Sequence, residues 1–177
     1  MTMAVHTLTV ISVIITLTSL SAGADTPCPS TCSCAVSPQS STDSVGRQGV
    51  AVTCSNVQLT SLPAQLPTNA ASLDVSGNRL EVLDSSSLPR SGVDGLSTAN
   101  FSRNRIITIA TEAFSQWSNL VSLDLSANRL SSIDHGTFRG APQTSLQILD
   151  LSGNRLTDVD GGFSGMTNLD RLVTTSQ

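Results

Sequence analysis

One eight-residue pattern returns four times along the chain, and this repetition constrains the fold more than any other feature. The copies read LDVSGNRL at residues 73–80, ANFSRNRI at 99–106, LDLSANRL at 123–130 and LDLSGNRL at 149–156. Aligned on their asparagine, they lie 26, 24 and 26 residues apart. Such spacings fall within the roughly 20–29 residues of a solenoid turn made of one short strand and a return segment. The chain therefore builds one surface from copies of a single part.

The residue types of the pattern each have a structural reason. Alternating leucines point to one side of a strand, and one repeat cannot bury that side alone. Neighbouring repeats must therefore stack and pair their strands in parallel. We expect a right-handed curved solenoid of the α/β type with a parallel sheet on its concave side. The asparagine can donate and accept hydrogen bonds where the chain leaves the strand, so an asparagine ladder is predicted at Asn78, Asn104, Asn128 and Asn154.

The return segments carry further apolar residues at regular positions. We expect these to be buried, including Trp117, the single tryptophan of the chain. The predicted residues are Ile109, Phe114, Trp117, Ile133, Phe138, Val159, Phe163 and Met166. Two repeats are longer by two residues, in segments 88–96 and 139–146, whose glycine, proline and serine predict surface loops opposite the strands.

The two ends of the chain differ from the repeats. Residues 8–20 are mostly apolar and are followed by Ala22 and Ala24, which predicts a signal peptide over residues 1–24 with cleavage after Ala24. Residues 25–67 are predicted to form a cysteine-rich cap. Residues 68–177 would then hold about four and a half repeats, because Leu169 and Leu172 begin a fifth copy. We expect such a solenoid to be incomplete at its carboxy-terminal end, since terminal repeats require polar caps.

Four cysteines lie close together after the predicted cleavage site: Cys28, Cys32, Cys34 and Cys54. An even number of clustered cysteines in a secreted chain predicts disulfides, with three possible pairings. A four-thiolate zinc site is the alternative, but the paired CxxC spacing typical of zinc is missing. We favour disulfides and expect no metal.

The motif CPSTCSC at 28–34, then LTSLPAQLP at 59–67 and the repeats, resembles extracellular leucine-rich repeat proteins with a cysteine-rich amino-terminal flank. The resemblance covers nearly all of residues 28–177. It implies disulfides Cys28–Cys34 and Cys32–Cys54, although the gap before Cys54 is longer than usual in that family. The lengthened repeats and a glycosylation sequon in the second copy also resemble a membrane-anchored member associated with inhibition of Wnt signalling.

The residue between the paired leucines must face outward on the concave side, and stacking makes columns of such residues. The predicted binding face consists of Asp74, Asn100, Asp124 and Asp150, with Ser76, Ser102, Ser126 and Ser152 beside them. These residue types are also common fillers of the repeat, and that interpretation is the simpler one. The sequon NFS at 100–102 makes Asn100 an expected glycosylation site.

Composition excludes several classes of function. The net charge is −4 and there is no electrostatic footprint for nucleic acid. Besides His6, only His135 could serve as an imidazole base, and no phosphate-binding glycine loop follows a strand. An active site needs one unique constellation, whereas these serines and aspartates repeat. We therefore expect no enzyme, no cofactor and no small-molecule substrate.

The sequence thus predicts a module for protein–protein recognition in the secretory pathway, outside the cell or at its surface. We favour the ectodomain of a receptor or signalling modulator, attached to the membrane only through a downstream segment that this chain lacks. The alternative is a secreted leucine-rich protein of the extracellular matrix.

Overall fold

The computed structural model describes residues 27–37, 48–140, 142–159 and 161–175. The predicted signal peptide lies outside these residues. The boundaries expected for the cap and the repeats remain predictions.

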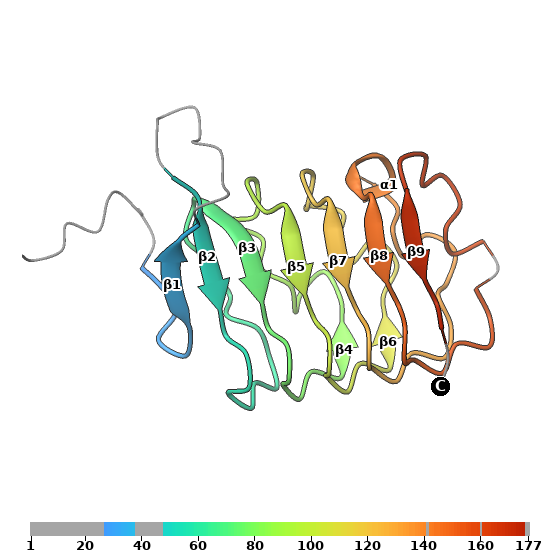
Figure 1. Ribbon diagram of the computed structural model, residues 1–177, viewed down its shortest axis with the longest axis horizontal. Helices are drawn as coiled ribbons and strands as arrows, with labels where there is room; N and C mark the ends of the chain where they lie inside the picture. Colours follow the sequence, from blue (N-terminus) through green and yellow to red (C-terminus); the bar gives the residue numbers. More distant parts are fainter. Residues whose placement is uncertain (1–26, 38–47, 141, 160, 176–177) are drawn as a thin grey trace, which may run out of the picture.

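Seven strands form one sheet whose spatial order follows the order of the chain (Figure 1). They are β1 (Ser33–Val36), β2 (Val50–Thr53), β3 (Ala70–Asp74), β5 (Thr98–Asn100), β7 (Ser122–Asp124), β8 (Ile148–Asp150) and β9 (Arg171–Val173). All neighbours from β2 to β9 pair in parallel, and β1 pairs antiparallel with β2. Behind this sheet, β4 (Val82–Leu83) pairs in parallel with β6 (Thr108–Ile109). The predicted parallel solenoid is confirmed.

The leucine frame forms the core between the sheet and the return segments. In the third copy, Leu120, Leu123, Leu125 and Leu130 are all at most 1% exposed. Leu156 of the fourth copy is half-buried. The other equivalent residues are buried: Ala70, Leu73, Val75 and Leu80 in the first copy; Leu96, Ala99, Phe101 and Ile106 in the second; and Leu146, Leu149 and Leu151 in the fourth. Burying one such side chain contributes about 1.5–3 kcal/mol, so stacked repeats obtain the apolar burial that an isolated one could not.

The asparagine of each copy joins its own turn to the preceding repeat. The Asn128 amide nitrogen donates to the carbonyl oxygens of Leu125 (2.9 Å) and Phe101 (3.0 Å), one in each repeat. Its Oδ1 accepts from the backbone nitrogen of Ile106 at 3.1 Å. One side chain therefore satisfies buried backbone groups on both sides of a repeat junction.

The same arrangement holds for the other members of the ladder. Asn104 bridges Val75 and Phe101 with its amide nitrogen, and Asn154 bridges Leu125 and Leu151. The four asparagines Asn78, Asn104, Asn128 and Asn154 are 5–8% exposed.

An aromatic cluster fills the space behind the sheet. The Phe114 ring lies 6.1 Å from Phe101, 5.4 Å from Trp117 and 6.2 Å from Phe138, between ring centroids. Phe163 extends the stack beyond Phe138 at 6.3 Å. Trp117 is buried as expected, and its indole nitrogen donates to the carbonyl oxygen of Pro89 at 3.3 Å.

The return segments differ from the predictions in two respects. Val159 is 40% exposed rather than buried, and Phe163 and Met166 are only partly buried. The residues expected to be surface loops in the lengthened repeats include buried Leu88 and Val93, and residues Pro142–Ser145 form the short helix α1. Figure 1 shows α1 beside the amino-terminal end of β8. The extra residues therefore contribute to packing because their apolar side chains fill space within the wider turns.

The cap is itself a degenerate repeat. Val52 and Thr53 of β2 pair with Leu73 and Asp74 of β3, so Val52 and Cys54 occupy the positions of the paired leucines. Disulfides join Cys28 to Cys34 and Cys32 to Cys54, the pairing implied by the resemblance. Cys54 is fully buried. One disulfide is therefore anchored in the core, where it ties β1 to the first turn of the solenoid.

Candidate functional site

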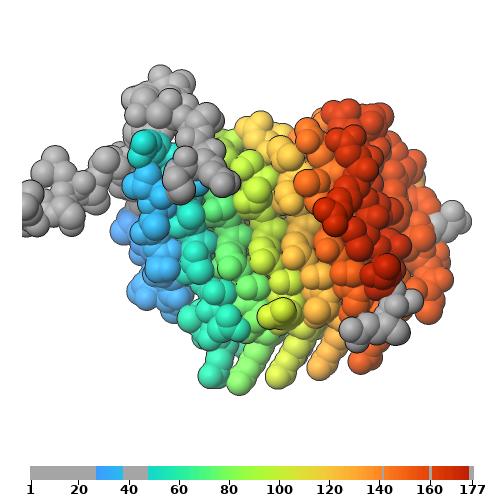
Figure 2. All heavy atoms as spheres, viewed as in Figure 1, coloured from blue at the N-terminus to red at the C-terminus, as the bar shows by residue number. Residues whose placement is uncertain are grey.

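The outward face of the seven-stranded sheet, here called the sheet face, shows the successive repeats as parallel bands (Figure 2). Strand register places its outward residues in two columns, one residue of each column per strand. The first column is Ala51, Ser72, Thr98, Ser122, Ile148 and Arg171, and the second is Thr53, Asp74, Asn100, Asp124, Asp150 and Val173. The side chains are mostly small and polar, so the face is accessible to a partner along its length.

The acidic column predicted from the sequence has a structural function. The Oδ1 atoms of Asp74, Asp124 and Asp150 accept from the backbone nitrogen two residues later, at 2.8–2.9 Å. Asn100 makes the same bond to the Ser102 nitrogen at 2.9 Å. Each side chain thus closes the turn that follows its strand, and all four are half-buried. Their repetition is explained by this turn.

The serine column contributes mainly its backbone. Ser102 is only 8% exposed, and Ser76, Ser126 and Ser152 are half-buried. Their carbonyl oxygens accept from backbone nitrogens of the preceding turn, for example Ser126 from Arg103 at 3.0 Å. These serines therefore belong to the turns between repeats, and their role as a binding column stays a prediction.

The first column is the more accessible one, and our sequence reasoning did not identify it. Thr98 and Ile148 are exposed, and Ser72 and Ser122 are half-buried. Ile148, at 39% exposed, is a large apolar side chain pointing outward from a polar face. The signal was present in the sequence, because strand alternation also turns the residue before the first paired leucine outward.

A depression of about 290 Å³ hollows the sheet face over β2, β3, β5 and β7. It is lined among others by Thr53, Ser72, Asp74, Thr98 and Asn100. The amide nitrogen of Asn100 makes no hydrogen bond to any residue that the structure describes. This nitrogen is the atom to which an N-linked glycan would attach.

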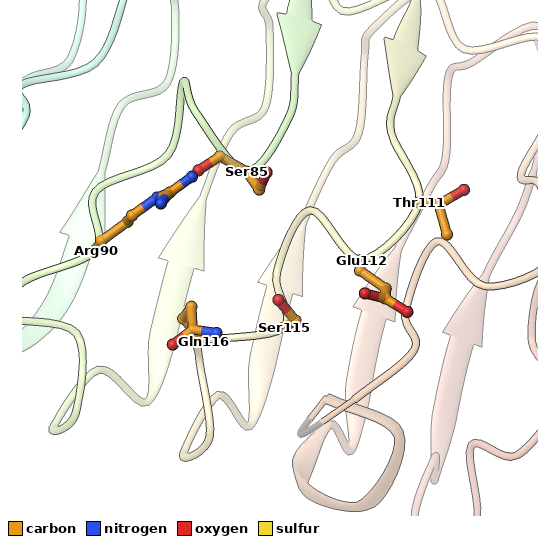
Figure 3. A pocket seen from close by; sticks show the side chains of 6 residues that line it. All are labelled: Ser85, Arg90, Thr111, Glu112, Ser115 and Gln116. Atoms are coloured by element: carbon orange, nitrogen blue, oxygen red, sulfur yellow. The ribbon is translucent and has the colours of Figure 1, made fainter.

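The back of the molecule has a second, polar depression of about 400 Å³, lined by Ser85, Arg90, Thr111, Glu112, Ser115 and Gln116 (Figure 3). The Arg90 Nε donates to the Ser85 carbonyl oxygen at 2.8 Å, and Glu112 lies 3.8 Å from Arg139. Just outside the depression, hydrogen bonds from the Ser86 hydroxyl and from the Ser87 and Ser86 amides hold the pKa of Asp84 below its ordinary value. The lining residues form no pairing of a nucleophile with a base.

All four cysteines are in disulfides, so the thiolates of a zinc site are not available. Within the described ranges, no three histidine, cysteine or acidic side chains converge on a common point. Nor does that part of the chain contain a helix long and apolar enough to cross a bilayer.

Comparison with known proteins shows a matching family and several similar proteins. A family model for leucine rich repeats matches residues 68–130 and 118–173. Tsukushi-A of Xenopus laevis is 36% identical over 97 residues, which is 55% of this chain and 28% of the relative. Amphoterin-induced protein 2 of Homo sapiens is 37% identical over 105 residues, or 59% of this chain and 17% of the relative. The chain thus spans about a quarter of the length of the Tsukushi proteins it matches.

Proposed function

Because the chain belongs to the leucine-rich repeat family, we propose that it binds a protein partner outside the cell through the sheet face and performs no catalysis. The proposal rests on one observation, a long and regular face of small, mostly polar side chains from which the apolar Ile148 is exposed. A regular polar surface with an exposed apolar residue suits recognition, since binding energy concentrates in a few apolar or aromatic anchors. The two disulfides support a location in the secretory pathway.

Within this class we propose the ectodomain of a receptor or signalling modulator. The Wnt-inhibitor type rests on the resemblance of the lengthened repeats and the sequon to trophoblast glycoprotein. The alternative is a secreted matrix protein, which would bind secreted matrix components in preference to cells. Whether the chain binds to cells or to matrix therefore distinguishes these two functions.

Asn100 is proposed to carry a glycan, because its sequon is intact and its amide nitrogen is unbonded. A glycan there would cover the centre of the sheet face. A partner would then contact the face on the β7–β9 side, where Ile148 lies two strands from β5, or roughly 10 Å away.

We expect the secreted chain to gain mobility on a denaturing gel after treatment with peptide N-glycosidase F. Asn100→Gln and Ser102→Ala should each produce this faster mobility without the enzyme, because either change destroys the NFS sequon. An enzyme-induced shift that persists in both variants would show that the glycan is attached elsewhere, and the absence of any shift would refute the modification.

The binding proposal is tested with Ile148→Ser on the full chain. We expect saturable binding of the fluorescently labelled chain to cultured cells, abolished when the cells are first treated with trypsin. The variant should bind about tenfold more weakly, because burial of one isoleucine contributes about 1.5–3 kcal/mol. Folding should be unaffected, since serine already occupies the same column at positions 72 and 122.

Ile107→Ser is the matched control, because Ile107 is 50% exposed but lies beyond the turn that follows β5. This variant should bind like the unchanged chain. Equal losses in the two variants, or trypsin-resistant binding, would contradict recognition of a protein by the sheet face.

A further inference from the structure

Four arginines follow the four ladder asparagines directly, and we call them the arginine row: Arg79, Arg105, Arg129 and Arg155. All four are exposed. Each backbone nitrogen donates to a carbonyl oxygen of the preceding turn: Arg79 to Leu59, Arg105 to Leu80, Arg129 to Ile106 and Arg155 to Leu130, at 2.8–2.9 Å. These bonds hold the four residues at equivalent positions in successive repeats.

The row runs along the edge where the chain leaves the carboxyl ends of the strands. In Figure 1 this is the lower edge, and Figure 2 shows parallel side chains projecting from it. Neighbouring parallel strands lie about 4.8 Å apart, so the row presents a positive charge at intervals of roughly 5 Å. Arg103 adds a charge beside Arg105, which places five of the nine arginines of the chain on one edge.

These guanidinium groups have no ionic partner among the residues that the structure describes. The acidic column is engaged with its own turns, and no ion pair between described residues involves a member of the row. The nearest carboxylates in sequence are Glu81 and Asp158, beside Arg79 and Arg155 at the two ends of the row. Two arginines on the back of the molecule are engaged, since the Arg90 side chain donates to the Ser85 carbonyl oxygen and Arg139 pairs with Glu112. The row is therefore a band of unpaired positive charge on an acidic protein.

The chemistry of the row favours a linear anion. A guanidinium group presents paired N–H donors that match sulfate, phosphate or carboxylate oxygens. Neither the sheet-face depression nor the back depression includes a member of the row. A straight array of regularly spaced cations fits a chain whose anionic groups also repeat.

We propose that the arginine row binds a linear sulfated polysaccharide, the polyanion of cell surfaces and matrix. This rests on the extracellular location proposed above but not on protein recognition by the sheet face. The polysaccharide would lie across β3, β5, β7 and β8 at their carboxyl ends, with its sulfates against successive guanidinium groups. Such binding would weaken as salt rises, because it releases counterions from the polyanion.

The test compares two sets of variants of the full chain on immobilised heparin. The row variant carries Arg79→Gln, Arg105→Gln, Arg129→Gln and Arg155→Gln. It should bind at least about tenfold more weakly at physiological salt, since each exposed ion pair contributes up to roughly fivefold. The dependence of its affinity on salt should also be shallower. Melting temperatures of both proteins show whether the fold is retained.

The control variant carries Arg90→Gln and Arg139→Gln, which remove charge from the back, and it is compared with the double variant Arg105→Gln and Arg129→Gln. We expect the control to bind heparin normally and the row double variant to lose affinity. Equal losses in the two double variants would refute the row as the site. Unchanged binding to fully desulfated heparin would overturn the proposal of a sulfated polysaccharide. Stronger binding to polyglutamate would favour an acidic polypeptide instead, and stronger binding to phosphatidylserine vesicles would favour a membrane. Failure of Ile148→Ser to affect cell binding would leave this result standing.

Discussion

Replacing Asn128 by leucine is expected to lower the free energy of unfolding by about 3–5 kcal/mol and to reduce the secreted yield. The change removes the donors to Phe101 and Leu125 and the acceptor for Ile106. All three backbone groups lie at a buried repeat junction where water cannot replace the lost bonds. Each unsatisfied group costs about 1–3 kcal/mol, and the apolar leucine side chain offsets only part of the total. Urea unfolding followed by circular dichroism measures the difference.

Two variants make the result specific to the ladder. Asn128→Asp keeps an acceptor for Ile106 but loses both donors. Its free energy of unfolding should therefore lie between those of the unchanged chain and of Asn128→Leu. Asn119→Leu is the matched control, because Asn119 is exposed and bonds only the Asp94 carbonyl oxygen at 2.5 Å. It should change stability by less than about 1 kcal/mol. Comparable losses for Asn119→Leu and Asn128→Leu would contradict the special role of the ladder.

Phe114→Ala is expected to lower the free energy of unfolding by about 3–5 kcal/mol. The Phe114 ring is fully buried and contacts the rings of Phe101, Trp117 and Phe138. Its removal would leave a cavity at the centre of the aromatic cluster, where the rigid solenoid cannot collapse around it. Chemical denaturation should therefore show a lower midpoint with a similar slope.

Phe163→Ala serves as its control within the same cluster. Phe163 is half-buried and contacts a single ring, Phe138. Its loss should be less than half that of Phe114→Ala, because less apolar surface returns to water. If the two variants were equally destabilised, the cluster would not have its centre at Phe114.

The repeat frame could be predicted from the sequence because each of its residues has one structural role. Leu123 and Leu125 must share a side of the strand, and Asn128 must satisfy backbone groups on two sides. The spacing of such residues fixes strand, turn and stacking together. For the same reason the sequence predicted the sheet order and the buried Trp117.

The cap and the candidate site were harder to predict, for physical reasons. The leucine positions of β2 and its turn are occupied by Val52, Cys54 and Leu59. Because valine and cysteine replace leucine at two of them, the sequence does not match the repeat pattern there. The aspartate and serine columns repeat for the sake of the turns, so repetition alone could not separate a binding column from a structural one. The outward position of Ile148 follows from strand alternation, but its apolar side chain is of the type expected in the core. Val159 was predicted to be buried from its place in the frame but is exposed in the last described turn.

The order of the strands in the sheet has a consequence for biosynthesis. Because β2, β3, β5, β7, β8 and β9 pair in the sequence in which they are made, each new turn needs only the turn before it as a template. Contacts that join residues about one repeat apart form quickly, since short loops are easily closed. A growing polypeptide can therefore fold vectorially from its disulfide-bonded cap, with each new turn covering the apolar side of the turn made before it.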